Sequence, residues 1–335
     1  MKPLLSLALL SAFALSAQTK KIVISNADPQ MLQTLSGASP KVRLVSVTSA
    51  NIMKELTDAD AFIGEPTPEM VRAGKNLKWV QIMSAGAERV LFLSGGNDLR
   101  DSNIVLTNNR IVQGPEIADH ALALLLSLSR GLNNFIGDRK TETWDPRNYH
   151  GIELNGKTAV VIGMGGIGQQ IATRAWAFGM NVIGVDPQDY PISPFVKRMV
   201  KPDQLDDVLP EADVLFISAP HTEQSHKMVG PKQFSLLKKG SYFVAVSRGG
   251  VYDMPSLVKA LDEQRLAGAG VDVVDPEPLP KGHPLWNFNN AIITPHIAGR
   301  SDRDRGRMVS TIKENIARFA DGKPLLNVVN KQRGF

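Results

Sequence analysis

Short apolar runs alternate with helix-like segments from residue 21 onward. In the first third of the chain these runs are rich in valine and isoleucine, and they cover residues 21–25, 42–47, 60–64, 78–84 and 103–107. Helix-like segments such as NIMKEL and TPEMVRAG lie between them. Continuous apolar runs separated by helices are typical of parallel strands that are buried on both faces. The pattern therefore predicts one doubly wound α/β unit.

A long apolar segment, GPEIADHALALLLSLSRGL, follows this unit. Pro115 stands where a first helical turn tolerates proline, and Gly131 stands near the end of the segment. The interior is apolar on several sides, so we expect a helix that is buried between two bodies. This helix is interpreted as the first crossing between two domains.

A second series of apolar runs covers residues 158–163, 181–186, 213–219, 242–247, 269–274 and 291–295. Six strands are the number expected of a full dinucleotide-binding sheet. Beyond them, Ser301 and Asp304 resemble a capping box, and Met308, Ile312 and Ile316 recur at helical spacing together with Phe319. A helix at this place would return the chain to the first unit. The fold class expected is α/β, with two doubly wound parallel-sheet domains.

The composition is that of a globular protein. The chain has 335 residues, of which 43% are apolar and 21% charged, which is enough for two α/β domains. The net charge is +5 and the basic residues are scattered, so nucleic-acid binding is not indicated. The chain contains no cysteine, which excludes disulfides, thiolate catalysis and cysteine zinc sites.

Residues 1–19 have the features of a signal peptide. Lys2 supplies a short positive region, Leu4 to Leu15 are mostly apolar, and small residues allow cleavage after Ala17. The stretch is too short to span a membrane comfortably, and the alternative is a buried N-terminal helix. A periplasmic or secreted protein with no membrane contact after signal removal is expected, or a cytoplasmic one if the segment is not used.

The run VIGMGGIGQQIA carries the strongest motif of the chain. Gly163, Gly165 and Gly168 are spaced as G-x-G-x-x-G between an apolar strand and a helix. In this context the glycines let the backbone turn and approach a dinucleotide pyrophosphate, which then meets the amides of the helix start. About twenty residues on, Asp186 ends the next strand, where its carboxylate would accept hydrogen bonds from the adenosine ribose. Its charge would repel a 2′-phosphate, so NAD is favoured over NADP.

Three segments at the ends of later predicted strands contain polar residues that are suited to catalysis. They are SRGG with Arg248, DPEPLP with Glu277 and TPHIAG with His296. Interconversion of a 2-hydroxy acid and a 2-keto acid needs a cation for the carboxylate, an acid/base for the hydroxyl proton and a nicotinamide for the hydride. Arg248 suits the first need and His296 the second, while Glu277 suits the orientation of His296 and the stabilisation of its protonated form.

Together these residues resemble the D-isomer-specific 2-hydroxyacid dehydrogenases. The matching runs are LNGKTAVVIGMGGIGQQIA, GPEIADHALALLLSLSRG, SRGGVYD, GVDVVDPEPLP and HPLW before ITPHIAG, and the last favours the glyoxylate/hydroxypyruvate reductase-like branch. The resemblance implies a catalytic triad of Arg248, Glu277 and His296, and a substrate loop at Ala85 and Gly86. It also implies a homodimer with the 116–131 helix near the partner. The implied cofactor contacts are Gly163, Gly165, Gly166, Ile167, Gly168, Asp186, Val246, Ser247 and Asp272.

The resemblance also implies a domain arrangement. A Rossmann NAD-binding domain at 114–299 would be inserted into a flavodoxin-like substrate-binding (catalytic) domain formed by residues 20–113 and 300–335. The expected function is an NAD-dependent oxidoreductase that interconverts small 2-keto acids and D-2-hydroxy acids.

Three positions depart from the family pattern. Ala245 stands where asparagine is common, Asp119–His120 stands where Glu–His is common, and SAGAERV lacks an aspartate often found shortly after the glycine. An NAD(H)-sensing binding protein without catalysis stays open as an alternative, because the family includes corepressors. Formate oxidation is a further alternative, and Glu277 weighs against it.

The remaining histidines give no metal-binding pattern, and no metal is expected. His221, in PHTEQSH with His226, is predicted to belong to the cofactor pocket. His120 is predicted to be a helix-packing residue, and His150 and His283 are predicted to lie in loops.

Overall fold

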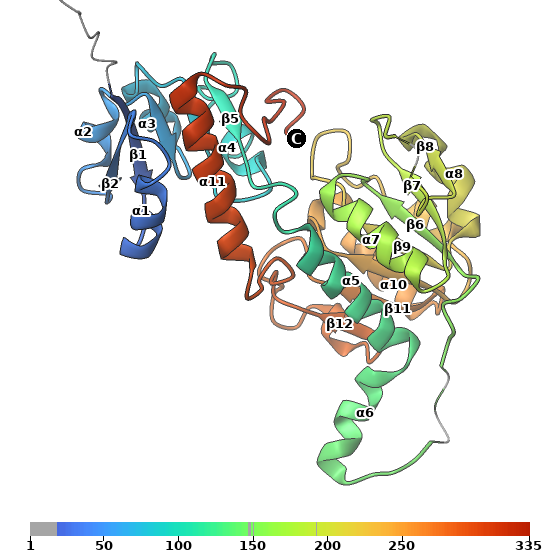
Figure 1. The fold of residues 1–335 in the computed structure, drawn as a ribbon. Helices are drawn as coiled ribbons and strands as arrows, with labels where there is room; N and C mark the ends of the chain where they lie inside the picture. Colours follow the sequence, from blue (N-terminus) through green and yellow to red (C-terminus); the bar gives the residue numbers. More distant parts are fainter. Residues whose placement is uncertain (1–18, 147–148, 150, 192) are drawn as a thin grey trace, which may run out of the picture.

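The protein consists of two parallel-sheet domains, which the computed structural model describes over residues 19–146, 149, 151–191 and 193–335 (Figure 1). The predicted signal peptide lies outside these residues except for its last position, and His150 also lies outside them. Within the described part, no helix combines the length and the apolar character that a membrane crossing requires.

The first domain contains all five predicted strands. Their order in the sheet is β2-β1-β3-β4-β5, and every neighbouring pair is parallel. This is the flavodoxin-like order. The elements are β1 (Lys20–Ser25), α1 (Pro29–Ser36), β2 (Val42–Val47), α2 (Ile52–Leu56), β3 (Ala61–Ile63), α3 (Pro68–Ala73), β4 (Trp79–Gln81), α4 (Glu88–Leu91) and β5 (Val105–Thr107).

The second domain is built on the order β12-β11-β10-β9-β6-β7-β8, again with all neighbours parallel. This is the doubly wound order of a dinucleotide-binding sheet, with β12 added at one edge. Its strands are β6 (Thr158–Ile162), β7 (Asn181–Val185), β8 (Arg198–Val200), β9 (Val214–Ile217), β10 (Ser241–Ala245), β11 (Leu266–Val271) and β12 (Ala291–Ile293). Its helices include α7 (Gly166–Ala177), α8 (Leu205–Val208), α9 (Pro231–Leu236) and α10 (Met254–Asp262).

The sheet therefore has seven strands rather than the six predicted. The strand that was not predicted, β8, has the sequence RMV and lies at an edge, where none of its three residues is fully buried. A short edge strand lacks the buried apolar run by which the other strands are recognised in the sequence.

The chain crosses from the first domain to the second at the long apolar helix α5 (Gly114–Ser129), as predicted. The prediction that this helix is buried between two bodies is wrong for all but its first turn, where Glu116 pairs with Arg307 of the last helix. The helix packs against α7, β10 and β11 inside the second domain, where ten of its sixteen residues are buried. Its apolar residues face both the sheet and a neighbouring helix, which explains why the pattern is apolar on several sides. The chain then turns at Gly131, in the left-handed region at φ 61°, into the short helix α6 (Leu132–Asp138).

The last helix, α11 (Asp304–Asp321), returns to the first domain as predicted and packs beside α1 (Figure 1). A buried polar network fixes it there. The side-chain amide of Asn315 donates to Gln81 Oε1 at 3.0 Å, and Thr107 Oγ1 donates to the same oxygen at 2.8 Å. All three side chains are fully buried, so each hydrogen bond also avoids an unpaired polar group in the core.

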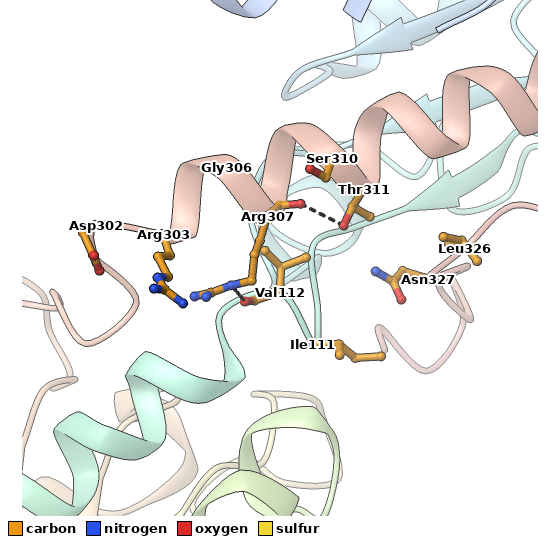
Figure 2. A pocket seen from close by; sticks show the side chains of 10 residues that line it. All are labelled: Ile111, Val112, Asp302, Arg303, Gly306, Arg307, Ser310, Thr311, Leu326 and Asn327. Carbon is orange, nitrogen blue, oxygen red and sulfur yellow. Dashed lines mark hydrogen bonds between the residues drawn. The ribbon is translucent and has the colours of Figure 1, made fainter. Parts of the chain in front are cut away.

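The first turn of α11 lies beside the segment that leads into α5 (Figure 2). An open pocket of about 710 Å³ lies between them and is lined by residues of both. Arg307 crosses this junction, because its Nε donates to the carbonyl of Val112 at 2.9 Å and its Nη2 lies 2.5 Å from Glu116 Oε2. At the same junction Ile111 has φ 85°, a conformation that is costly for a β-branched residue. Both connections between the domains are therefore held together at one place.

Candidate active site

The glycine turn is formed as the motif predicts. Gly163 leaves β6 with φ 89°, and a Cβ atom at this position would clash with the backbone of Ala219. A Cβ at Gly168 would clash with the carbonyl of Gly163, so the third glycine allows α7 to pack closely on the strand. At Gly165 no protein atom lies near the position of a Cβ.

The open position at Gly165 is the observation that fits a bound dinucleotide. Gly165 lines the large cleft and precedes α7, whose first amides have no partners within the helix. Since the protein itself leaves room for a side chain there, the missing side chain benefits a ligand that approaches the backbone. Gly163, Gly166 and Ile167 line the same cleft, while Gly168 does not.

Asp186 is placed at the end of β7, with a side chain that is almost fully buried at the wall of the cleft. Its Oδ2 accepts from the amide of Met164 at 2.7 Å, and its Oδ1 accepts from the amide of Gln188 at 2.8 Å. The carboxylate therefore fixes the glycine turn, and each oxygen keeps a second lone pair for a ribose hydroxyl. Nearby, burial raises the pKa of Tyr190, and the charge of Asp186 raises it further.

Ser247 and Val246 follow β10 and also line the cleft. The hydroxyl oxygen of Ser247 is buried and has no hydrogen-bond partner among the described residues. A buried polar atom without a partner is costly, and a ligand in the cleft would supply one. This orphaned hydroxyl is a second feature that fits a bound cofactor.

Arg248, Glu277 and His296 come together at the carboxyl ends of β10, β11 and β12. His296 Nδ1 lies 2.8 Å from Glu277 Oε2, and His296 Nε2 lies 3.4 Å from Nη1 of Arg248. The ring is thus held by a carboxylate on one side, while its other nitrogen and the guanidinium face the same space. Arg248 and His296 line the cleft, and Glu277 stands behind the histidine.

Asp272, predicted as a cofactor contact, holds the loop of His296. Its side chain is 1% exposed. Oδ1 accepts from the amide of Ile297 and Oδ2 from the amide of Ala298, both at 2.9 Å, while Thr294 Oγ1 donates to Oδ1 at 2.5 Å. His296 itself has φ 54°, a sparsely populated conformation that this set of hydrogen bonds maintains.

His120 belongs to the same set of contacts. Its Nε2 lies 2.9 Å from Thr294 Oγ1, so α5 is tied to the strand end that presents His296. The sequence predicted only that His120 helps to pack its helix, and this contact with Thr294 was not predicted. The sequence signal that was available is its position on the helix that packs against β11, which becomes meaningful only once the sheet order is known.

The predicted substrate loop, Ala85 and Gly86, belongs to the first domain and lines the cleft. The side-chain amide of Asn108 donates to the carbonyl of Ala85 at 2.6 Å, and that of Asn109 donates to the carbonyl of Met83 at 2.8 Å. Among the described residues, no hydrogen-bond acceptor is found for the amides of Ala85 and Gly86. Both residues line the cleft, so these unpaired amides are available to a ligand there.

His221 was predicted to belong to the cofactor pocket, but it does not line the cleft. Its Nε2 lies 3.0 Å from His226 Nδ1, and its ring packs so closely on Gly250 that a Cβ there would clash with it. Burial lowers the pKa of His221, and the neighbouring His226 lowers it further. The pair therefore supports the backbone beside Arg248. No group of three or more metal-binding side chains occurs among the described residues.

The cleft that joins these parts has a volume of about 1010 Å³ and is lined by both domains. Its second-domain wall contains the glycine turn, Asp186 and Ser247, and its far end brings Arg248 and His296 opposite the substrate loop. The geometry provides a long site for a dinucleotide that ends at a cation, an imidazole and two free amides.

Comparisons with known proteins agree with this geometry. Residues 122–298 match the model of the D-isomer specific 2-hydroxyacid dehydrogenase NAD binding domain. The chain is 31% identical over 293 residues to a glyoxylate reductase from Korarchaeum cryptofilum, which covers 84% of this chain and 86% of the relative. The chain belongs to the D-isomer specific 2-hydroxyacid dehydrogenase family.

Another relative in this family is D-3-phosphoglycerate dehydrogenase from Archaeoglobus fulgidus, which is 31% identical over 295 residues. That match covers 86% of this chain, and the chain spans about half (53%) of the length of the relative. Among solved structures, the NADPH-dependent glyoxylate/hydroxypyruvate reductase from Sinorhizobium meliloti, in complex with NADP and sulfate, is 25% identical with a TM-score of 0.80. It covers 94% of this chain and 100% of its own.

The predicted family and fold class are confirmed by these comparisons. A nicotinamide dinucleotide is the cofactor for which the second domain is built, since the family's NAD-binding domain is present and the glycine turn leaves the required space.

Proposed function

We propose that this chain is an oxidoreductase that interconverts small 2-keto acids and D-2-hydroxy acids with NAD as its cofactor. The observation that carries the proposal is the meeting of Arg248, His296 and the free amides of Ala85 and Gly86 at one end of the dinucleotide cleft. The names of the relatives, glyoxylate reductase and D-3-phosphoglycerate dehydrogenase, support the same reaction class.

Arg248 would hold the substrate. Its guanidinium would donate to the carboxylate from Nη2, since Nε donates to Glu88 and Nη1 to the carbonyl of Ser247. The amides of the substrate loop would meet the same carboxylate from the other side of the cleft. The positive charge beside the keto oxygen also stabilises the negative charge that develops there in the transition state.

His296 would move the proton. In the reductive direction the protonated ring donates Nε2–H to the keto oxygen as that oxygen gains negative charge. The carboxylate of Glu277, 2.8 Å from Nδ1, orients the ring and stabilises its charged form. The nicotinamide, when bound, supplies the hydride to C2 in this direction and accepts it in the reverse direction.

His296→Ala is expected to lower kcat for keto-acid reduction on the order of 10²–10⁴-fold, because general acid–base catalysis contributes that much. Steady-state rates with NADH and a panel of glyoxylate, hydroxypyruvate, pyruvate and bulkier keto acids measure this. His283→Ala, in a loop away from the cleft, is the control and should stay near the wild-type rate. If His296→Ala reduces the best substrate as fast as wild type, the proton-transfer role is wrong.

The same panel separates catalysis from sensing. If wild type binds NADH, as followed by fluorescence, but turns over none of these acids, the chain is the NAD(H)-sensing protein of the alternative hypothesis. The set formed by Arg248, Glu277 and His296 favours catalysis, since a nucleotide sensor needs no acid/base group at the nicotinamide end.

The preference for NAD over NADP is assigned to Asp186. Asp186→Asn keeps the shape of the side chain and one acceptor, but it removes the charge that would repel a 2′-phosphate. We expect the ratio of kcat/KM for NADPH to that for NADH to rise about 10-fold, from a loss of ~1–2 kcal/mol of repulsion. Asp189→Asn, which removes a 96% exposed charge nearby, serves as control. An unchanged ratio in Asp186→Asn would rule out this role.

We also propose a homodimer, but its contact surface is not the 116–131 helix that the resemblance implies. The 116–131 helix uses its apolar residues within its own domain, whereas α6 and the residues after it extend from the body (Figure 1) and expose Leu132, Ile136 and Trp144. We expect Ile136→Glu to convert a dimer into a monomer in light scattering after size-exclusion chromatography. Leu93→Glu, at a 72% exposed residue of the first domain, should leave the dimer intact. A wild-type monomer would contradict the proposal.

Export is proposed from the composition of residues 1–19 alone. Cell fractionation with mass spectrometry of the mature N-terminus tests it, and cleavage after Ala17 in a periplasmic or secreted fraction is the expected result. An intact N-terminus in the cytoplasm would show that the segment is not used as a signal.

A further inference from the structure

Glu88 begins α4 directly after the substrate loop, and its carboxylate meets the guanidinium of Arg248. The distance from Glu88 Oε1 to Arg248 Nε is 2.6 Å, and the two side chains are 17% and 29% exposed. This is a half-buried ion pair inside the cleft, where Glu88 also lines the wall. Glu88 takes no part in the proposed proton and hydride transfers.

The contacts of Arg248 show that its ion pair with Glu88 fixes the orientation of the guanidinium. Nε donates to Glu88, and an Nη1 hydrogen is donated to the carbonyl of Ser247 at 2.7 Å. A guanidinium is planar, so two contacts on different nitrogens fix both its position and its plane. The remaining nitrogen, Nη2, lies against Gly86, where a Cβ would clash with it, and no acceptor for Nη2 is found among the described residues.

The pair also joins the two walls of the cleft. Glu88 belongs to the first domain and Arg248 to the second, so their contact sets the distance between the guanidinium and the substrate loop. Since Glu88 directly follows that loop, the Nη2 edge of Arg248 is presented to the amides of Ala85 and Gly86. Without the carboxylate, the long arginine side chain would be held only by the carbonyl of Ser247 and the weak contact with His296.

We propose that Glu88 is a positioning residue for the reaction, which acts by holding Arg248 with its Nη2 edge toward the substrate loop. The proposal rests on the proposed function, because it assumes that Arg248 binds the carboxylate of a 2-keto acid. The opposite role, in which Glu88 competes with the substrate for Arg248, predicts the opposite change in KM.

The test compares Glu88→Ala, Glu88→Gln and wild type in steady-state reduction of the best keto acid with NADH. Glu88→Ala is expected to raise KM and to lower kcat, with kcat/KM reduced about 10- to 100-fold, as for loss of a hydrogen bond to a charged group. Glu88→Gln keeps an oxygen that accepts from Nε, so it should recover part of both parameters. Glu69→Gln removes an exposed carboxylate that pairs with Arg72 and should match wild type.

Two further measurements exclude a merely structural effect. The NADH dissociation constant, from fluorescence titration, should be the same in all variants, and the thermal midpoints should agree within a few degrees. A combined rise in KM and fall in kcat with partial recovery in Glu88→Gln then supports positioning.

Other outcomes overturn the proposal in distinguishable ways. If Glu88→Ala lowers KM at unchanged kcat, Glu88 is a competitor of the substrate. If Glu88→Ala matches wild type, Glu88 has no role in the reaction, while the proposed function stands. If wild type turns over no keto acid, the proposed function fails and the role of Glu88 fails with it.

Discussion

The site depends on a property of parallel sheets: all strands end at the same edge. In the second domain this edge gathers the glycine turn after β6, Asp186 after β7, Arg248 after β10 and His296 after β12, although they are far apart in the sequence. The first domain contributes its own loops beyond β4 and β5. Because ligands in open α/β sheets bind beyond the carboxyl ends of the strands, a cleft between two such edges receives donors from both sides.

Hydrogen bonds hold this arrangement at two levels. Asn315, Gln81 and Thr107 attach α11 to the first sheet, so that one domain is made from both ends of the chain. Within the site, Asp272 and Thr294 fix the loop that gives His296 its unusual backbone conformation. Most of these groups are buried, where a polar group without a partner is costly. Removal of one side chain would therefore leave its partners unpaired and destabilise the network.

The sequence was sufficient for the elements that are buried on both faces. The eleven predicted strands were found because each has a continuous apolar run, and the glycine motif was found because its spacing reflects backbone geometry. β8 was missed because an edge strand needs no such run. The place of α5 was wrong because an apolar helix looks the same whether it is covered by its own domain or by another one. The contacts of Asp272 and Glu88 were not predicted because their partners lie 22 or more residues away, and only the sheet order brings them together.

The most direct test of the central claim is a crystal structure with NADH and oxamate, an unreactive analogue of a 2-keto acid. We expect the oxamate carboxylate to lie between Arg248 and the amides of Ala85 and Gly86, its amide carbonyl oxygen to lie at His296 Nε2, and the nicotinamide C4 to face its C2. Oxamate bound elsewhere, or a nicotinamide ring placed away from His296, would contradict the proposed roles of Arg248 and His296.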